Sequence, residues 1–351
     1  MTKETLFGQT PDQLARTVTG LGMPRFTARQ LAEWFYKKGI REFERMTNIS
    51  ARNRALLAER FDQGVHLPAR ESISADGTRK YLFETDRGRF VESAYIPDGE
   101  RATLCVSSQA GCRMGCRFCM TARQGFQHHL STAEILNQIL SLPLRDRLTN
   151  LVYMGMGEPL DNPDQVLRSL EILTAEWGMG WSPTRITLST AGILPSLKRF
   201  LDESRVHLAV SLHNPFAEER ARIMPVEKMY PIEQVVELLR RYDFSHQRRV
   251  SFEYIVMSGL NDSPAHIKGL TRLLAGLPCR INLIRFHKIP ESPFFSPGQE
   301  AMEHFRDELS RHGIITTIRA SRSEDIQAAC GLLSTREQLE RTRPDGQAEK
   351  K

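Results

Sequence analysis

The chain has 351 residues, of which 40% are hydrophobic and 26% charged, proportions typical of a globular protein in water. No apolar run is long enough to span a bilayer, and residues 1–20 lack a basic-then-apolar secretion signal, so we expect a cytoplasmic protein with no membrane segment. Lysine and arginine (48) exceed aspartate and glutamate (42) by six, which permits a phosphate-contacting face without establishing one.

The first part of the chain is predicted to form a small module of helices followed by strands. Residues 10–62 place apolar side chains such as Leu31 and Trp34 at helical spacing. Residues 67–96 instead alternate turn signals with runs rich in Thr, Tyr, Phe and Val, which predicts short antiparallel strands. We therefore assign residues 1–96 to an N-terminal accessory domain.

From about residue 102 the pattern changes to alternating strands and helices. Strands rich in Val, Ile and Leu are predicted at 103–108, 150–156, 185–190, 206–212, 249–256 and 280–286. Helices are predicted between them at 131–141, 163–176, 194–202, 232–243 and 264–275. This order indicates an α/β fold, a partial (β/α)6 TIM-like barrel within residues 97–336. A seventh strand (314–320) and a short helix (323–329) would complete it, and the charged residues 337–351 are expected to form a flexible tail.

Three cysteines follow the first predicted barrel strand in the spacing C-x3-C-x2-C. Cys112, Cys116 and Cys119 lie within eight residues, so one loop can supply three thiolates to an iron–sulfur cluster. A 4Fe-4S cluster bound by only three thiolates leaves one iron open. That iron can chelate S-adenosylmethionine (SAM) and pass an electron to its sulfonium, which yields a 5′-deoxyadenosyl radical. The alternative is a structural zinc site completed by His128 or His129, although zinc ligands usually come in two separate pairs.

Three further cysteines stand outside this loop. Cys105 lies on the first predicted strand, and Cys330 lies near the end of the barrel domain. Each of these two alone could be a small buried hydrophobe. Cys279, at the entry to a strand, is expected to be structural. In a cytoplasmic chain of this size a disulfide framework is not expected, so metal binding or catalysis is the better interpretation of the set.

Small and polar residues follow the other predicted strands, where barrel active sites lie. Gly157 allows close backbone approach to a ligand, and Glu158 could accept a hydrogen bond from the ammonium group of SAM. Further candidates end the third, fourth and sixth strands: Ser189, Ser211, Leu212, His213 and His287. For His213 an ordinary hydrogen-bonded histidine is the competing interpretation.

The segment around the cysteine loop is basic. Between Glu100 and Glu134 there is no acidic residue, while four arginines and two histidines occur there, at Arg101, Arg113, Arg117, Arg123, His128 and His129. This stretch could meet RNA phosphates beside the active site. The arginines could equally offset the charge of an anionic cluster, or be solvated.

Several of these motifs together resemble the RlmN/Cfr family of radical SAM RNA adenine methyltransferases. The resemblance is carried by Cys105–Phe126, Gly155–Leu160, Leu188–Gly192, Ser211–His213 and Asp325–Gly331. The N-terminal stretches Phe26–Trp34 and Met46–Asn48 are similar to the first module of the RlmN branch. The resemblance implies a radical SAM barrel preceded by an RNA-binding accessory domain.

The resemblance also implies roles for named residues and two SAM molecules per turnover. Cys330 takes a methyl group from the first SAM, and the radical formed from the second removes hydrogen from that S-methyl group. Cys105 then resolves the RNA–protein adduct through a transient disulfide, and Glu92 matches the proposed proton acceptor. SAM contacts are implied for Gly157, Glu158, Ser189, Ser211, Leu212 and His213. His287 stands where the family usually has Asn.

The implied substrates are an adenosine in the peptidyl-transferase centre of 23S rRNA and the adenosine 3′ to the anticodon in some tRNAs, methylated at C2. An electron donor such as flavodoxin or ferredoxin and a monomeric state are expected. Three alternatives stay open: methylation at C8 as in the Cfr branch, another radical SAM class such as an activating enzyme for a glycyl radical partner, and a zinc-dependent RNA-binding protein. The second has no use for Cys105 and Cys330.

Overall fold

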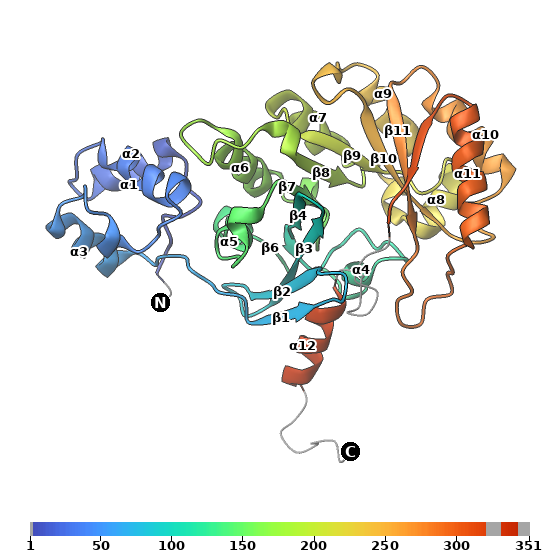
Figure 1. The fold of residues 1–351 in the computed structure, drawn as a ribbon. Helices are drawn as coiled ribbons and strands as arrows, with labels where there is room; N and C mark the ends of the chain where they lie inside the picture. Colours follow the sequence, from blue (N-terminus) through green and yellow to red (C-terminus); the bar gives the residue numbers. More distant parts are fainter. Residues whose placement is uncertain (1–2, 321–330, 343–351) are drawn as a thin grey trace, which may run out of the picture.

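The computed structural model describes residues 3–320 and 331–342. The chain begins with a helical part that lies to one side of a large sheet (Figure 1). It comprises α1 (Pro11–Gly20), α2 (Thr27–Ala32), η1 (Glu33–Lys37), η2 (Phe43–Arg45) and α3 (Ala51–Arg60). Thr10 starts α1 through a capping box, in which the Gln13 N–H donates to Thr10 Oγ1 (3.4 Å) and the Thr10 N–H donates to Gln13 Oε1 (2.9 Å).

The sheet combines an antiparallel and a parallel region. Its strand order is β1-β2-β3-β4-β7-β8-β9-β10-β11-β12. The antiparallel region contains β1 (Arg70–Ile73), β2 (Arg79–Glu84) and β3 (Phe90–Asp98), and β3 pairs with β4 (Arg101–Cys105). The sheet therefore runs on across the boundary placed at residues 96 and 97 from the sequence. Because β3 pairs with the outer edge of β4, this edge of the barrel is covered.

From β4 onward all neighbouring strands are parallel. They are β4, β7 (Asn150–Tyr153), β8 (Ile186–Thr190), β9 (His207–Ser211), β10 (Val250–Val256), β11 (Cys279–Arg285) and β12 (Ile315–Ile318). Side chains of β10 are almost all buried, as expected for a parallel strand covered on both faces. The six predicted barrel strands and the seventh are confirmed, so the α/β partial-barrel assignment holds.

Helices connect these strands in the predicted order. The connections contain α5 (Thr132–Leu140), α6 (Pro163–Thr174), α7 (Leu194–Glu203), α8 (Ala217–Ile223), α9 (Ile232–Leu239), α10 (Pro264–Leu274) and α11 (Gln299–Arg311). Two of them, α8 and α11, are absent from the sequence prediction. The helix predicted at 323–329 lies outside the described residues.

The last described helix, α12 (Leu332–Thr342), returns to the antiparallel strands (Figure 1). It contacts β3, and Leu333 is buried with Leu82 and Phe90. Residues 337–342, predicted from the sequence to belong to a flexible tail, therefore continue this helix. Among the described residues no helix is long and apolar enough to cross a membrane.

The helical N-terminal part is fixed to the barrel through α5. Arg41 is buried and donates to the Gly64 carbonyl (2.6 Å), Asn137 Oδ1 (2.7 Å) and Ser141 Oγ (2.6 Å). Three charge-assisted hydrogen bonds satisfy a guanidinium that would otherwise be costly to bury. The helical part and the barrel consequently share one continuous apolar core.

Candidate active site

The three clustered cysteines lie in the loop between β5 (Gln109–Ala110) and α4 (Met120–Arg123), beyond the carboxyl end of β4. Burial raises the pKa of the Cys112 thiol to about 12. Burial, and then the neighbouring Cys119 and Cys112, raise the pKa of Cys116 well above its usual value. The thiols are therefore close enough to affect one another. These pKa values are those of the free thiols, whereas an iron–sulfur cluster would bind the side chains as thiolates.

A zinc site is not formed by the described residues. In the ranges 3–320 and 331–342, no group of three or more His, Cys, Asp or Glu side chains is arranged to hold a metal ion. His128 and His129 lie in β6 (His128–His129), where the ring of His129 contacts Gln109 (3.0 Å) and Arg113 (3.3 Å). Zinc needs its ligands around one point, whereas each thiolate of an iron–sulfur cluster binds its own iron. The observation that favours the cluster over zinc is therefore the supply of three thiolates by one loop.

One wall of the cysteine loop is built from α8 and the following turn η6 (Pro225–Lys228). Cys116, Phe118 and Met120 pack against an apolar cluster that contains Ile223, Met224, Val226, Met257, Phe286 and Ile289. The Arg117 N–H, inside the loop, donates to the Ile223 carbonyl at 3.0 Å. The position of the cysteines is thus fixed by a second segment far away in sequence.

The loop after β7 carries Gly157 and Glu158 against β5. Gly157 has a φ of 98°, and a Cβ atom there would lie 2.5 Å from the Gln109 Cβ. Only glycine allows this backbone path and this close approach. The neighbouring Glu158 N–H donates to Gln109 Oε1 at 2.8 Å. The glycine therefore lets the loop lie directly on the strand that leads into the cysteines.

Glu158 is buried and links two strand ends. Its carboxylate accepts hydrogen bonds from Thr190 Oγ1 (2.6 Å), the Ala191 N–H (2.8 Å) and the Leu160 N–H (3.1 Å). Burial raises its pKa to about 7 despite these donors. The carboxylate expected to receive the SAM ammonium thus also joins the ends of β7 and β8.

The other SAM candidates lie at the same edge of the sheet. Ser189 is in β8 and Ser211 ends β9. The buried Leu212 donates its N–H to the Glu253 carbonyl at 3.0 Å. His287 is half-buried and follows the end of β11 at Arg285. Since β8, β9 and β11 are parallel, their carboxyl ends meet at one mouth, as predicted.

His213 is held in one protonation state. Its Nδ1 accepts the Ile255 N–H at 3.0 Å, so the neutral ring carries its proton on Nε2. Desolvation by burial, followed by the nearby Arg220 charge, lowers the pKa of the ring to about 3. Phe118 of the cysteine loop meets the ring edge-on at 4.9 Å. The ring is a neutral Nε2–H donor beside the cysteines.

Cys330 itself lies outside the described residues, but the residues that follow it are placed. Gly331 has a φ of 92°, and a Cβ there would lie 2.8 Å from Thr121 Oγ1. Gln124 Nε2 donates to the Gly331 carbonyl (2.7 Å) and contacts Ser334 Oγ (2.9 Å) and Thr335 Oγ1 (2.6 Å). The start of α12 is therefore attached to α4, the helix directly after Cys119.

Glu92 and Cys105 lie on neighbouring strands of the same region. The buried Glu92 carboxylate accepts the Ser334 N–H at 2.7 Å and lies 3.5 Å from Lys80 Nζ. Cys105 is buried in β4, opposite Ala94 of β3. The predicted base thus contacts the helix that follows Cys330. The Glu92 carboxylate thus has two partners, the Ser334 N–H and the Lys80 ammonium group.

Comparison with known proteins agrees with this geometry. Residues 106–268 match the model of the radical SAM superfamily, and residues 5–62 match that of the ribosomal RNA large subunit methyltransferase N-terminal domain. A Bacteroides fragilis protein named probable dual-specificity RNA methyltransferase RlmN is 55% identical over 97% of this chain and 99% of its own length. The chain belongs to the RlmN family.

Other RlmN-type relatives and one solved structure extend this match. A Porphyromonas gingivalis protein of the same name is 58% identical over 95% of this chain and 94% of its own. The crystal structure of a radical SAM methyltransferase from Sphaerobacter thermophilus has a TM-score of 0.87 and 39% identity. The match covers 93% of this chain and 98% of the Sphaerobacter thermophilus chain. The matches thus include the helical N-terminal part as well as the barrel.

Three residues that organise this RlmN-type site were not among the sequence candidates: Gln109, Gln124 and Arg220. Gln109 and Gln124 stand within the Cys105–Phe126 motif, so their place beside the cysteines was available as a signal. No signal in the sequence singled out Arg220, because arginine in a short charged segment usually indicates a solvated face. Its burial depends on contacts with distant strand ends.

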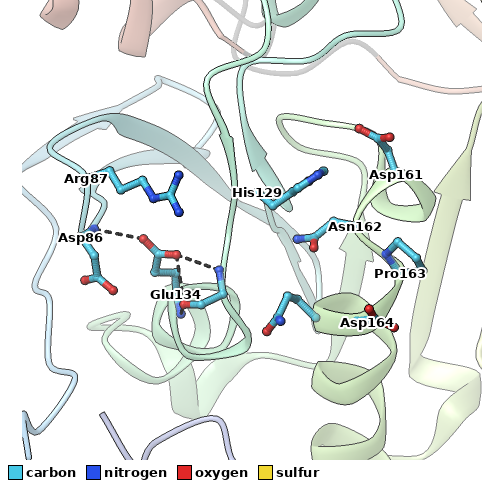
Figure 2. Close-up of a pocket in the computed structure, with 10 residues that line it drawn as sticks. Asp86, Arg87, His129, Glu134, Asp161, Asn162, Pro163 and Asp164 are labelled. Carbon is cyan, nitrogen blue, oxygen red and sulfur yellow. Dashed lines mark hydrogen bonds between the residues drawn. The ribbon is translucent and has the colours of Figure 1, made fainter. Parts of the chain in front are cut away.

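A separate hollow lies beside the site, and His129 is the one residue of the sequence predictions that lines it (Figure 2). It measures about 490 Å³ and lies between the β2–β3 turn and the starts of α5 and α6. Glu134 there accepts the Asp86 N–H at 3.0 Å (Figure 2) and the Ser131 N–H at 2.7 Å. Glu134 caps backbone groups and Asp161 and Asp164 pair with Arg113 and Arg199, so these carboxylates have a structural explanation.

The basic stretch around the cysteines is partly neutralised within the chain. Arg113 pairs with Asp161 (2.9 Å) and lies over the Phe126 ring at 4.0 Å. Arg123 donates to the Pro290 carbonyl. These contacts orient the two arginines at the edge of the cysteine loop. The contact of this stretch with RNA phosphates stays a prediction.

Proposed function

We propose that this chain methylates C2 of an adenosine in the peptidyl-transferase centre of 23S rRNA and of the adenosine 3′ to the anticodon in some tRNAs. The names of its RlmN relatives support dual RNA specificity. The match of residues 5–62 to an RNA methyltransferase N-terminal domain supports the RlmN branch over the C8-methylating Cfr branch. The target base must leave its stack to reach the barrel mouth, which is easiest in a loop.

The proposed cofactors are a 4Fe-4S cluster and SAM, two molecules per turnover. Cys112, Cys116 and Cys119 would hold the cluster. Gly157, Glu158, Ser189, Ser211, Leu212, His213 and His287 would line the SAM site. When bound, the pair supplies a carbon-centred radical, which is needed because C2 of adenine is electrophilic and its hydrogen is not acidic.

The remaining chemistry falls to three residues of the chain. The Cys330 thiolate takes the methyl group of one SAM as its S–CH3 bond to the sulfonium breaks, and later gives up one hydrogen atom of that methyl group. The carbon then bonds to adenine C2. The adduct radical would pass one electron to a one-electron acceptor such as the oxidised cluster, and Glu92 would take the C2 proton. The Cys105 thiolate then attacks the Cys330 sulfur. The S–S bond forms, the C–S bond breaks, and the released carbon takes a proton.

The observation that carries this proposal is the attachment of residues 331–335. Gly331, the neighbour of Cys330, lies against Thr121 just beyond the cysteine loop. Ser334 donates its N–H to Glu92. The segment after Cys330 is thus attached both to α4, which directly follows the loop proposed to hold the cluster, and to the proposed base. This arrangement supports a role for position 330 in the reaction.

The test is anaerobic reconstitution followed by methylation of rRNA and tRNA fragments, with digestion to nucleosides and chromatography coupled to mass analysis. Wild-type protein should contain about four irons per chain, need an electron carrier such as flavodoxin, and yield 2-methyladenosine. C330A should keep its iron but form no methylated base, and C105A should accumulate RNA–protein adduct.

A matched control is C279A. Cys279 is half-buried at the start of β11 and packs against the main apolar core, so its loss should leave methylation intact. Methylation by C330A at the wild-type rate would refute the methyl-carrier role. Formation of 8-methyladenosine would assign the chain to C8 chemistry. Elution of the active protein as a dimer would contradict the expected monomer.

A further inference from the structure

Helix α8 and turn η6 form a bridge between the cysteine loop and the ends of two barrel strands. The Ile223 carbonyl at the end of α8 accepts the Arg117 N–H from the loop at 3.0 Å. The side chain of Arg220, one turn earlier in α8, bonds to the strand ends. Any shift of α8 therefore acts on both sides of the site.

The Arg220 guanidinium is fully buried and uses its fork on three backbone carbonyls. Nε donates to the Leu212 carbonyl (2.9 Å), and Nη2 donates to the carbonyls of Ser211 (2.9 Å) and Ala191 (3.1 Å). The Ser211 and Leu212 carbonyls lie at the end of β9, and the Ala191 carbonyl directly follows β8. Both segments carry SAM candidates. One side chain thus sets the spacing of two adjacent strand ends.

The charge of Arg220 is balanced by Glu227 of η6. Its Nη1 donates to Glu227 Oε2, which also accepts the Ile232 N–H at 3.0 Å. Glu227 Oε1 is buried with no hydrogen-bond partner within the described part of the chain. Packing alone does not call for such a pair, since apolar side chains of similar volume often stabilise a core equally well. A buried pair kept beside a cofactor loop points to a role in the site.

Arg220 acts electrostatically on both neighbours of the bridge. Its positive charge opposes the burial effect on the Cys116 thiol, and it adds to the burial effect that keeps the His213 ring neutral. The guanidinium is thus near a cysteine of the loop as well as the SAM-side histidine. A cation at this position favours a thiolate-bound anionic cluster.

We propose that Arg220 is a positioning residue of the radical SAM centre, holding the ends of β8 and β9 at the spacing that SAM requires and placing a fixed positive charge beside Cys116. This inference rests on the proposed cluster and SAM sites. It predicts two separable effects: the fork controls SAM affinity, and the charge controls the reduction potential of the cluster.

The test compares three variants of the reconstituted full-length enzyme. R220M/E227Q removes the pair without leaving a lone buried charge, and R220K keeps the charge but cannot span three carbonyls. R41M is the matched control, because Arg41 is also buried and bonded to three acceptors but lies between the helical N-terminal part and α5. The readouts are iron content, the dissociation constant for SAM by calorimetry and the midpoint potential of the cluster.

R220M/E227Q should bind SAM roughly tenfold to a hundredfold more weakly and have a more negative midpoint potential. R220K should share the loss of affinity and keep the potential near the wild-type value. R41M should change neither quantity. Wild-type affinity in R220K would overturn the role of the fork, even if the double variant failed to fold. A wild-type potential in the double variant would overturn the role of the charge.

These outcomes are distinct from failure of the proposed function. If the wild-type chain itself holds no iron or binds no SAM, the cofactor sites are wrong. If it holds both and the Arg220 variants match R41M, only this inference fails.

Discussion

Replacing Gly157 by alanine should damage the proposed SAM site through two separable costs. A left-handed φ such as 98° at this position costs an L residue about 1–2 kcal/mol. The added Cβ would also lie 2.5 Å from the Gln109 Cβ and 2.8 Å from its backbone nitrogen. Forcing a carbon into packed atoms costs about 1–3 kcal/mol. We expect G157A to lose about 2–5 kcal/mol of unfolding free energy, and to bind SAM more weakly because the loop must move away from β5.

Two other glycines separate these costs. Gly180 has a φ of 66° but no atom within 4 Å of a built Cβ, and Gly20 has neither a positive φ nor a close neighbour. G180A should therefore lose only the backbone cost, about 1 kcal/mol. G20A should be neutral or gain up to about 1 kcal/mol. Urea unfolding measures the stability of all three variants, and calorimetry measures SAM binding to the reconstituted proteins.

Close contact between Gly157 and Gln109 would be refuted if G157A unfolded at the same urea concentration as G180A and bound SAM with wild-type affinity. That result would mean that the loop after β7 does not press on Gln109. A loss of SAM affinity in G180A equal to that in G157A would be just as damaging, because Gly180 lies after α6 and away from the site.

Three further predictions concern single side chains. Burial raises the pKa of Glu158 from 4.5 to about 7, so the folded chain binds more protons than the unfolded chain between these values. The unfolding free energy of cluster-free protein should fall by up to about 3 kcal/mol as pH rises through this window, and E158Q should lack this slope. Burial and Arg220 lower the pKa of His213 to about 3. Its NMR ring shifts should therefore not titrate between about pH 5 and 8, and H213N should weaken SAM binding; a titration near neutral pH would refute the assignment. In Q124L the amides of residues 331–335 should exchange hydrogen faster than in wild type, because their side-chain anchor is gone, whereas unchanged exchange would show that other contacts hold α12.

Local spacing in the sequence was sufficient for the cysteine loop and for the order of the barrel strands. Cys112, Cys116 and Cys119 are neighbours in the chain, so their loop needs no tertiary contact to be recognised. The parallel strands are continuous apolar runs, and most predicted ranges differ from the observed ones only at the ends. Gly157 and Glu158 were found because they directly follow such a strand.

Contacts between distant segments could not be predicted in this way. The strands within 67–96 were correctly expected, but their pairing with β4 across residue 97 depends on which edge the barrel leaves open. Arg220 stands in a seven-residue helix with Glu218, Glu219 and Arg222, a composition that predicts a solvated face. Only the fold brings three strand-end carbonyls around its guanidinium.

The attachment of the helical N-terminal part to α5 fixes its distance from the cysteine loop. Arg41 donates hydrogen bonds to Asn137 and Ser141 near the end of that helix. The helix starts at Thr132, just after β6, which pairs with the strand that leads into the cysteine loop. This helix of 9 residues therefore contacts the helical N-terminal part near one end and begins next to the cysteine loop at the other. If residues 5–62 bind RNA, their distance from the barrel mouth is fixed. The enzyme would then select a target adenosine that lies at this distance from the bound site on the folded RNA.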